Sequence, residues 1–362
     1  MRILHLSSAT SWRGGEQQIA YLIEELQKMG VECLVACRKE SVFEEHCRKN
    51  QIPHKSFPFR NTMDFSTSWQ VKKYANQEGV DLIHAHTSIT HSIAVWAHLL
   101  GAKPGIIVSR RIDNPIKKKW LTLFKYRYTG VKRIVCVSHL IEKVVNQTIQ
   151  KPEKTLTVHS GIDLQKFEVE PASISLKEEF NMPIEHLLIG NASALAGHKD
   201  YPTFIAVAEK LLQKGLEATF VIIGDGEEKE KLHQLVAEKC LEGKIIFTGF
   251  RKDIPQLLPQ LDLFLFTSET EGLGTTLLDA IACKVPVVAT RAGGAPEVII
   301  HEKTGLSCEV KDVQCLTDQV EKMVSDETLR TTLVANASKH LKNFTKENTA
   351  KKTLDIYKEV IG

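Results

Sequence analysis

The sequence contains no long run of apolar residues. No stretch approaches the roughly 20 consecutive apolar residues that a membrane-spanning helix needs. The first seven residues are too few, and become polar too quickly, to form a secretion signal, and they predict a buried strand instead. We therefore expect a cytoplasmic protein.

The cysteines lack the spacing of a metal site. All eight are scattered, and the closest pair, Cys33 and Cys37, does not have the CxxC spacing of metal ligands. This pattern predicts reduced thiols in or near the cores, as is usual in the cytoplasm. No Asp-x-Asp pair occurs where it could hold an ion, so we expect neither a metal nor another cofactor.

A strong excess of one charge is also missing. The net charge is only +3, which gives no indication of a nucleic-acid partner. Hydrophobic residues make up 43% of the chain and charged residues 25%, as in globular proteins. Because 362 residues are more than one ordinary domain with a single hydrophobic core contains, we expect two domains.

The first 36 residues predict a strand, a helix and a second strand. Residues 3–6 and 31–36 are apolar runs, and between them four apolar residues recur on one helical face. Gly14 and Gly15 lie between the first strand and the helix, where doubly wound α/β folds bind phosphates or sugars. The third glycine of the dinucleotide motif GxGxxG is missing. A plain tight turn is the alternative interpretation.

Three further strands in the first half end in polar or charged residues. Residues 80–86 end at His86, residues 106–109 lead into Arg110 and Arg111, with Asp113 close behind, and residues 134–138 lead into a helix. Ligands of open α/β sheets bind at the carboxyl ends of strands. Two guanidinium groups at such an end suit a phosphate or a carboxylate. A structural role is the alternative for His86.

The segment 110–133 is basic and aromatic. It contains nine Lys or Arg residues and one acidic residue, with Trp120 and Phe124 among them. Such a segment suits an anionic membrane surface or an acidic lipid-linked acceptor. A solvated helix with its apolar face in the core is the alternative.

The stretch 268–282 predicts a glycine loop followed by a short helix between two buried strands. Gly274 and Thr275 stand where the helix begins, and free amides and the helix dipole favour a phosphate there. Glu271 in the loop and Asp279 in the helix could accept hydrogen bonds from sugar or ribose hydroxyls. Alternatively, Thr276 and Asp279 form a capping box that only starts the helix.

Lys199 precedes another predicted helix. Pro202 lies in the first turn of that helix, so Lys199 is placed in the loop at the end of the strand 187–193. A lysine there could neutralise a pyrophosphate. A solvated surface lysine is the alternative.

Five segments together resemble the pattern of family-4 glycosyltransferases, and they occur in the family's order over essentially the whole chain. They are Gly14-Gly15, residues 160–163, Lys199, residues 271–279 and residues 293–297. The chain departs from that pattern at three positions. Asp279 replaces the usual Glu, Ala194 replaces an Arg five positions before the lysine, and Ser160 replaces an Asn.

The resemblance implies the GT-B architecture, in which two Rossmann-like doubly wound α/β domains face a cleft. Residues 1–165 would form the acceptor-side domain, residues 166–345 the nucleotide-sugar domain, and the last helix, 346–362, would pack back on the first. The reaction implied is transfer of a sugar, with retention, from a nucleoside-diphosphate sugar to an acceptor hydroxyl. The acceptor would be a lipid-linked or cell-surface saccharide, as in lipopolysaccharide or polysaccharide biosynthesis, at the inner face of the membrane.

The resemblance and the strand-end positions together assign three groups of site residues. The catalytic group is Glu271, Lys199 and Arg111; the donor-binding group is Gly15, Arg110, Gly274, Thr275 and Asp279; and the acceptor-side group is Gly14, His86 and Asp113. Two other functions stay open at this point. One is a sugar-nucleotide 2-epimerase of the same fold, and the other is a non-catalytic nucleotide-sugar binding protein.

Overall fold

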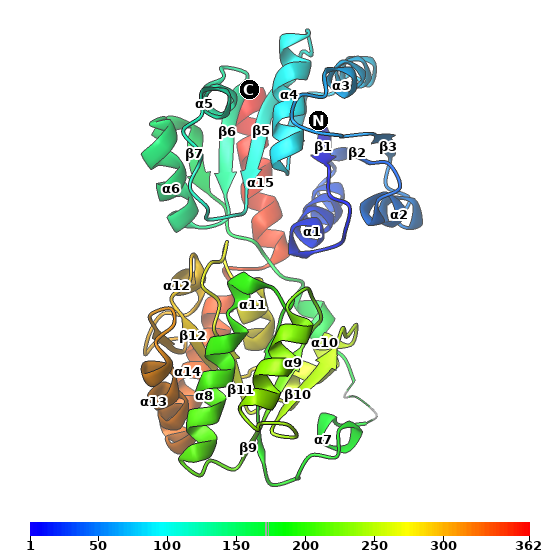
Figure 1. Ribbon diagram of the computed structural model, residues 1–362. Coiled ribbons are helices and arrows are strands. Elements are labelled where there is room, and N and C mark those ends of the chain that lie inside the picture. Colours follow the sequence, from blue (N-terminus) through cyan, green and yellow to red (C-terminus); the bar gives the residue numbers. More distant parts are fainter. Residues whose placement is uncertain (171, 173) are drawn as a thin grey trace. The chain divides into compact units, whose positions relative to one another are not determined.

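The chain forms two units, each built on one parallel sheet (Figure 1). The computed structural model describes residues 1–170, 172 and 174–362. The first unit comprises Met1–Gly161 and Thr345–Gly362, and the second comprises Ile162–Phe344. The chain thus leaves the first unit at Gly161, four residues before the boundary expected from the sequence.

The first unit contains a seven-stranded sheet in the order β3-β2-β1-β4-β5-β6-β7. All neighbouring strands are parallel, and the order reverses between β1 and β4. The strands are Arg2–Ser7 (β1), Glu32–Arg38 (β2), His54–Phe57 (β3), Leu82–Ala85 (β4), Gly105–Arg110 (β5), Val131–Cys136 (β6) and Thr155–Thr157 (β7).

Helices cover both faces of this sheet because side chains alternate along each strand. Leu4 and Leu6 of β1 belong to a core with α3 (Phe65–Gln77), α4 (Ser88–Leu99), α5 (Trp120–Arg127) and α6 (His139–Ile149). Ile3 points to the opposite face, into a core with α1 (Gly14–Lys28), α2 (Val42–Lys49) and α15 (Lys346–Ile361). The C-terminal helix is therefore part of the first unit.

The second unit contains a six-stranded parallel sheet in the order β10-β9-β8-β11-β12-β13, which reverses between β8 and β11. Its strands are Leu187–Ala192 (β8), Ala218–Ile223 (β9), Ile245–Gly249 (β10), Leu263–Phe266 (β11), Val287–Thr290 (β12) and Leu306–Cys308 (β13). Its helices are Leu176–Glu179 (α7), Tyr201–Gln213 (α8), Lys229–Glu238 (α9), Ile254–Leu257 (α10), Thr275–Ala282 (α11), Ala295–Val298 (α12), Val313–Ser325 (α13) and Glu327–Leu341 (α14). Two doubly wound parallel sheets confirm the predicted α/β class.

One cysteine pair corrects the expectation of reduced thiols throughout. Cys308, at the end of β13, forms a disulfide with Cys315 in the first turn of α13, with a Cα–Cα distance of 5.9 Å. The short turn after β13 folds the helix back on the strand end, so two residues seven positions apart meet. The spacing of these cysteines resembles no motif, and the sequence alone did not reveal the pair.

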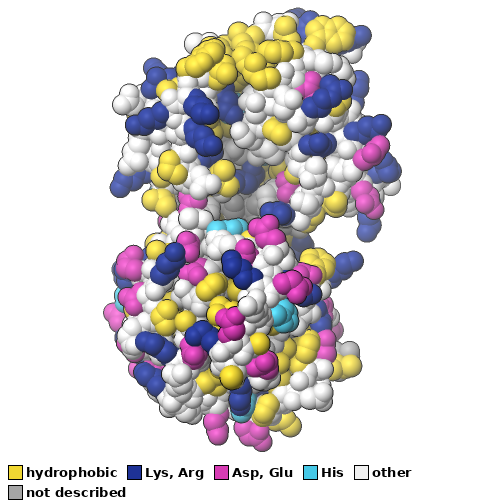
Figure 2. Space-filling view, viewed as in Figure 1, with side chains coloured by type: hydrophobic (Ala, Val, Ile, Leu, Met, Phe, Trp, Pro, Cys, Tyr) yellow, Lys and Arg dark blue, Asp and Glu magenta, His cyan; other side chains and the backbone are white. Residues whose placement is uncertain are grey.

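The surface differs between the units on the face shown in Figure 2. Basic and acidic side chains are interspersed on the second unit, whereas apolar side chains gather at one end of the first unit. Within the described part of the chain, no helix combines the length and apolar character needed to cross a bilayer.

Candidate active site

Lys199 and Glu271 meet at the point where the strand order of the second unit reverses. Lys199 ends a short 3-10 turn, Gly197–Lys199, in the connection that follows β8, and Glu271 lies in the loop after the neighbouring strand β11. Their side chains form an ion pair, and they are only 14% and 12% exposed. Ligands of doubly wound sheets bind at this reversal. The structure therefore brings together two of the predicted catalytic residues.

Hydrogen bonds hold the Glu271 loop in place. Ser268 Oγ donates to Glu271 Oε1 at 3.0 Å, and Thr290 Oγ1 donates to the Ser268 carbonyl at 2.6 Å. Thr267 Oγ1 donates to the Lys199 carbonyl at 3.2 Å, which joins the two loops. Sequence reasoning missed Ser268, although its position directly after a buried strand was a usable signal.

The glycine pair 293–294 allows a third loop to approach Glu271. The amide of Gly294 donates to the Glu271 carbonyl at 3.2 Å. Gly293 has φ +54°, and a Cβ atom there would lie 1.9 Å from that carbonyl oxygen. Any larger residue would push the loop away. This glycine therefore positions Glu271 and need not touch a ligand.

Helix α11 begins without a side-chain cap. Its N-cap is Gly274, with φ +83°, which has no side chain to cap the first turn. Thr276 is the second helical residue, and its hydroxyl has no partner among the described residues. The capping-box interpretation of Thr276 and Asp279 is therefore wrong. The uncapped start leaves amides near Gly274 and Thr275 available to an anion.

Asp279 lies on α11 in a low-dielectric environment. Burial raises the pKa of its carboxyl group to about 7, and the nearby Lys166 only partly offsets this shift. At neutral pH the group is therefore poised between its two protonation states. It can accept a hydrogen bond from a hydroxyl or donate one.

In the first unit, His86 lies at the reversal between β1 and β4. Its Nε2 is 3.0 Å from His5 Nδ1, and Arg111 Nη1 is 3.4 Å from its Nδ1. Because the guanidinium can only donate, His86 carries its proton on Nε2 and donates to His5. Beside it, Ser8 Oγ and Thr87 Oγ1 are 2.7 Å apart, which ties the loop after β1 to the N-cap of α4.

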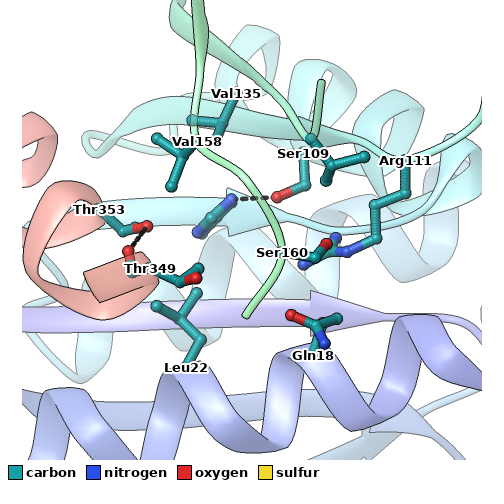
Figure 3. A pocket seen from close by; sticks show the side chains of 11 residues that line it. Gln18, Leu22, Ser109, Arg111, Val135, Val158, Ser160, Thr349 and Thr353 are labelled. Carbon is teal, nitrogen blue, oxygen red and sulfur yellow. Dashed lines mark hydrogen bonds between the residues drawn. The ribbon is translucent and has the colours of Figure 1, made fainter. Parts of the chain in front are cut away.

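A small cavity lies beneath this cluster (Figure 3). It measures about 20 Å³, and Arg111 extends into it toward Ser160 and Gln18. His84 lines it and is bonded to Ser109 Oγ at 2.8 Å and to Tyr357 of α15 at 2.5 Å. The volume suits a single water molecule.

The buried rings of the first unit are neutral at physiological pH. Burial, with a smaller contribution from Arg111, lowers the pKa of His5 to about 3, and burial also lowers the pKa of His84 and His86 well below the usual range. Burial lowers the pKa of Arg111 to about 10, so its guanidinium stays charged. Nitrogens of the three histidines lie within 4.8 Å of one another. Because both nitrogens of His84 already have partners and Arg111 lies alongside, the cluster fits a hydrogen-bonded core better than a cation site.

The two adjacent arginines point to opposite sides of β5. Arg110 donates to the Asn114 carbonyl and lies near Tyr126 and Lys125. Arg111 instead contacts His86. Successive residues of a strand alternate in direction, so the two guanidinium groups do not form the paired anion site that the sequence suggested. Asp113 lies half-buried in the loop between β5 and α5.

The predicted glycine turn of the first unit is the first turn of a helix. Gly14 and Gly15 are the first two residues of α1, whose N-cap Arg13 donates its amide to Glu16 Oε2 at 3.2 Å. Apart from the backbone of α1 and the two neighbouring residues, no atom of the described residues lies within 4 Å of where a Cβ atom of Gly15 would be. The open space leaves this backbone accessible to a ligand.

Two family models match consecutive parts of the chain. The model described as Glycosyltransferase Family 4 matches residues 12–166, almost entirely in the first unit, and the model described as Glycosyl transferases group 1 matches residues 174–340, in the second. The chain is a GT-B glycosyltransferase. The fold implied by the sequence resemblance is thereby confirmed.

Two curated proteins are similar to this chain over most of its length. N-acetyl-alpha-D-glucosaminyl L-malate synthase of Bacillus anthracis is 27% identical over 305 residues, which cover 82% of this chain and 80% of the relative. The UDP-Gal:alpha-D-GlcNAc-diphosphoundecaprenol alpha-1,3-galactosyltransferase of Escherichia coli is 22% identical over 312 residues, with the same coverage of both chains.

A solved structure shares the fold over nearly the whole chain. HepE of Anabaena, in complex with UDP and glucose, has a TM-score of 0.85 at 22% identity and covers 99% of this chain and 100% of its own. Of the predicted residues, Lys199, Glu271, Gly274, Thr275 and Asp279 belong to the second unit, and the remaining ones belong to the first.

Proposed function

We propose that this glycosyltransferase moves a sugar from a UDP-sugar to an acceptor hydroxyl. The observation that carries the proposal is the Lys199–Glu271 ion pair beside the uncapped start of α11, at the strand-order reversal of the second unit. One cation, one carboxylate and free amides together match a diphosphate joined to a sugar. The UDP bound to HepE and the UDP-galactose in the name of the E. coli relative support the choice of nucleotide.

Departure of the diphosphate is the step that the protein must assist. Breaking the anomeric bond leaves a positive, oxocarbenium-like sugar and a negative leaving group. Lys199 and the amides at Gly274 and Thr275 would stabilise the diphosphate. Arg111 and Gly15 stay predicted donor contacts of the first unit. Glu271 would hold hydroxyls of the transferred sugar, and Asp279 those of the ribose.

The stereochemical outcome that we propose is retention, by attack of the acceptor on the face from which the diphosphate leaves. No protein nucleophile and no metal take part in this scheme. The resemblance to family-4 enzymes supports this part of the proposal.

The acceptor would be a lipid-linked or cell-surface saccharide, bound near Gly14, His86 and Asp113, with Arg110 holding the loop that contains Asp113. The E. coli relative is named for a diphosphoundecaprenol-linked acceptor, which supports this choice. The enzyme would then work in polysaccharide or lipopolysaccharide biosynthesis at the cytoplasmic face of the membrane. The exposed lysines 117–119 would contact anionic lipid there.

A ligand screen followed by a transfer assay tests the donor proposal. UDP-sugars should raise the melting temperature more than GDP- or ADP-sugars do, because a ligand that binds only the folded state stabilises it. Glu271→Gln should lower kcat strongly while UDP affinity changes little. Preference for GDP or ADP donors would contradict the choice of UDP, and conversion of donor to an epimer without acceptor would contradict transfer. The E. coli relative is named a galactosyltransferase, which does not favour the epimerase.

Replacing Lys117, Lys118 and Lys119 together by Ser tests the membrane proposal. Each surface cation adds about 1 kcal/mol near anionic lipid, so binding to anionic vesicles at low salt should fall steeply. UDP affinity should stay unchanged. Full vesicle binding by the triple variant would leave these lysines as an ordinary solvated surface.

A further inference from the structure

Large apolar side chains are exposed together at one end of the first unit (Figure 2). They belong to α3, α4, α5 and the residues beside these helices. The most exposed aromatic ones are Trp120 at 74%, Trp69 at 52% and Phe65 at 48%. The others are Met63, Leu99, Leu100, Leu121 and Phe124. Contiguous exposed apolar surface of this kind commonly marks an interaction site.

Aromatic contacts connect the three helices into one surface. Phe65 of α3 lies 5.2 Å from Trp96 of α4, measured between ring centroids, and Trp96 lies 6.3 Å from Phe124 of α5. Phe124 in turn lies 5.7 Å from Tyr128. Trp96 is fixed by a hydrogen bond from Nε1 to the Thr62 carbonyl at 3.0 Å. We call this surface, defined by α3, α4 and α5, the aromatic platform.

The helical spacing explains why these rings face outward. On α3, Phe65 and Trp69 are four residues apart and exposed, whereas Val71 and Ala75 on another face are buried in the core. On α5, Trp120 and Phe124 repeat the same spacing, and Tyr126 is buried. Residues at positions i and i+4 share a helix face. Each helix therefore has its own buried face, and the exposed rings are additional to the core.

The charge on the platform has a single sign. The three helices contain 33 residues with four Lys or Arg and no Asp or Glu. At the chain's overall frequency of 44 acidic residues in 362, about four would be expected. The exposed lysines 117–119 directly precede α5. This pattern complements a negatively charged partner and disfavours a basic or neutral protein surface.

Trp and Tyr are suited to a particular kind of partner. Their rings are apolar and their polar groups can stay hydrated, so they concentrate at the boundary between lipid headgroups and acyl chains. A helix with exposed aromatic residues and basic neighbours binds in that boundary through both apolar burial and charge. An anionic bilayer satisfies the rings and the cations at once.

We propose that the aromatic platform is a membrane-docking surface whose outward side chains Phe65, Trp69 and Trp120 insert into the headgroup region of an anionic bilayer. This deepens the docking proposed for residues 110–133, on which it rests for the choice of partner. It adds α3 and α4 to the contact surface. It also assigns a salt-resistant apolar contribution, where the lysines supply only a salt-sensitive one.

Tryptophan fluorescence provides a direct measurement. Three of the four tryptophans, Trp69, Trp96 and Trp120, belong to the platform, whereas Trp12 packs against Phe43 and His46 elsewhere. Vesicles of phosphatidylglycerol and phosphatidylcholine should shift the emission to shorter wavelength, and brominated acyl chains should quench it. The vesicles contain no donor or acceptor, so the result does not depend on whether sugar transfer was assigned correctly.

Two sets of variants separate the apolar from the charged contribution. Phe65→Ser, Trp69→Ser and Trp120→Ser combined should weaken vesicle binding about tenfold or more, even in 0.5 M salt, because their insertion does not depend on charge. The lysine triple variant should lose binding mainly at low salt. As a matched control, Ile184→Ser with Phe250→Ser removes two exposed apolar side chains of the second unit, 81% and 70% exposed, and should bind vesicles as the unmodified chain does.

Three outcomes would overturn the proposal. One is vesicle binding without any quenching by brominated lipid. Another is equal binding by the aromatic triple variant at high salt. The third is a change of sedimentation coefficient in that variant in the absence of vesicles, which would identify the platform as a contact between copies of the chain.

Discussion

At the scale of single residues, the pairing of Lys199 with Glu271 changes what each side chain can be expected to do. The two were predicted for different parts of the donor, yet they form one ion pair with little exposure to solvent. Holding opposite charges together avoids the cost of leaving either one buried alone. In the proposed reaction, Lys199 would turn toward the bound diphosphate, and Glu271 would accept a hydrogen bond from a sugar hydroxyl.

Replacing Lys199 by Ala should lower kcat/KM by about 10²–10³, roughly 2.7–4 kcal/mol, if it stabilises the departing diphosphate. Steady-state kinetics with the donor identified in the ligand screen measure this loss. Lys210→Ala, which replaces a half-buried lysine of α8 bonded to Gln314, is the control and should keep its activity. An unchanged kcat/KM in Lys199→Ala would remove this residue from the mechanism.

Asp279 should make the stability of the protein depend on pH. Burial raises the pKa of its carboxyl group to about 7, so the folded protein holds this proton more tightly than the unfolded chain does. The free energy of unfolding therefore falls as pH rises from the ordinary carboxyl range to about 7. Asp279→Asn removes this dependence. The melting temperature of the variant, relative to that of the unmodified chain, should therefore rise between pH 5 and pH 8.

Melting curves at several pH values check this prediction, with the exposed Glu242→Gln as a control that should show no such trend. UDP affinity of Asp279→Asn should fall if the group contacts the ribose, and Asp279→Glu should be tolerated. A melting difference that does not change with pH would mean that the carboxyl titrates normally.

At the scale of elements, a disulfide links the end of β13 to the first turn of α13. The disulfide between Cys308 and Cys315 closes a loop of only a few residues at the edge of the second sheet. The other six cysteines are free thiols, four of them buried. A chain in which six thiols are free and two are joined differs from the fully reduced one that the scattered cysteines suggested.

Counting the reactive thiols tests this disulfide. Under denaturing conditions, alkylation should modify six cysteines before reduction and eight after it. Cys315→Ser should lower the free energy of unfolding by roughly 2 kcal/mol, because closing even a short loop restricts the unfolded chain. Eight reactive thiols before reduction would show that the pair is reduced in the isolated protein.

At the scale of the whole molecule, residues from both ends of the chain build the first unit. Gly161 and Thr345 lie against each other where the chain leaves and re-enters this unit, and a Cβ atom on Gly161 would lie 2.3 Å from the Thr345 carbonyl. Gln18 of α1 bonds both the amide and the carbonyl of Gly161. Tyr357 of α15 is fully buried and bonded to His84 of β4.

Tyr357→Ala should therefore destabilise the first unit by about 3–5 kcal/mol, since a large buried ring is lost. Tyr357→Phe should lower the free energy of unfolding by about 1–3 kcal/mol, since only the hydroxyl group bonded to His84 is removed. Hydrogen exchange should speed up in β4 and β5 and stay unchanged in β8 and β11. Lys352→Ala, on the exposed face of α15, is the control. Equal loss of protection in both sheets would mean that the units unfold as one.

The sequence alone was enough to predict the α/β class, the strand ends that contain Lys199, Glu271 and His86, and the family pattern. These predictions depend on local periodicity and on the residues that directly follow each strand. Both can be read from the sequence. The pairing of Lys199 with Glu271, 72 positions apart, depends instead on β8 and β11 being neighbours in the sheet. Pairing between distant strands is decided by the packing of the whole unit.

The same reason explains what the sequence did not reveal. The separation of Arg110 from Arg111, the uncapped start of α11 and the disulfide all depend on where a side chain points once its element is packed. The aromatic platform combines residues from three helices, of which only α5 lies in the basic segment that the sequence singled out. Helix periodicity predicts that Phe65 and Trp69 share a face, but only the tertiary structure decides that this face is left uncovered beside Trp96 and Phe124.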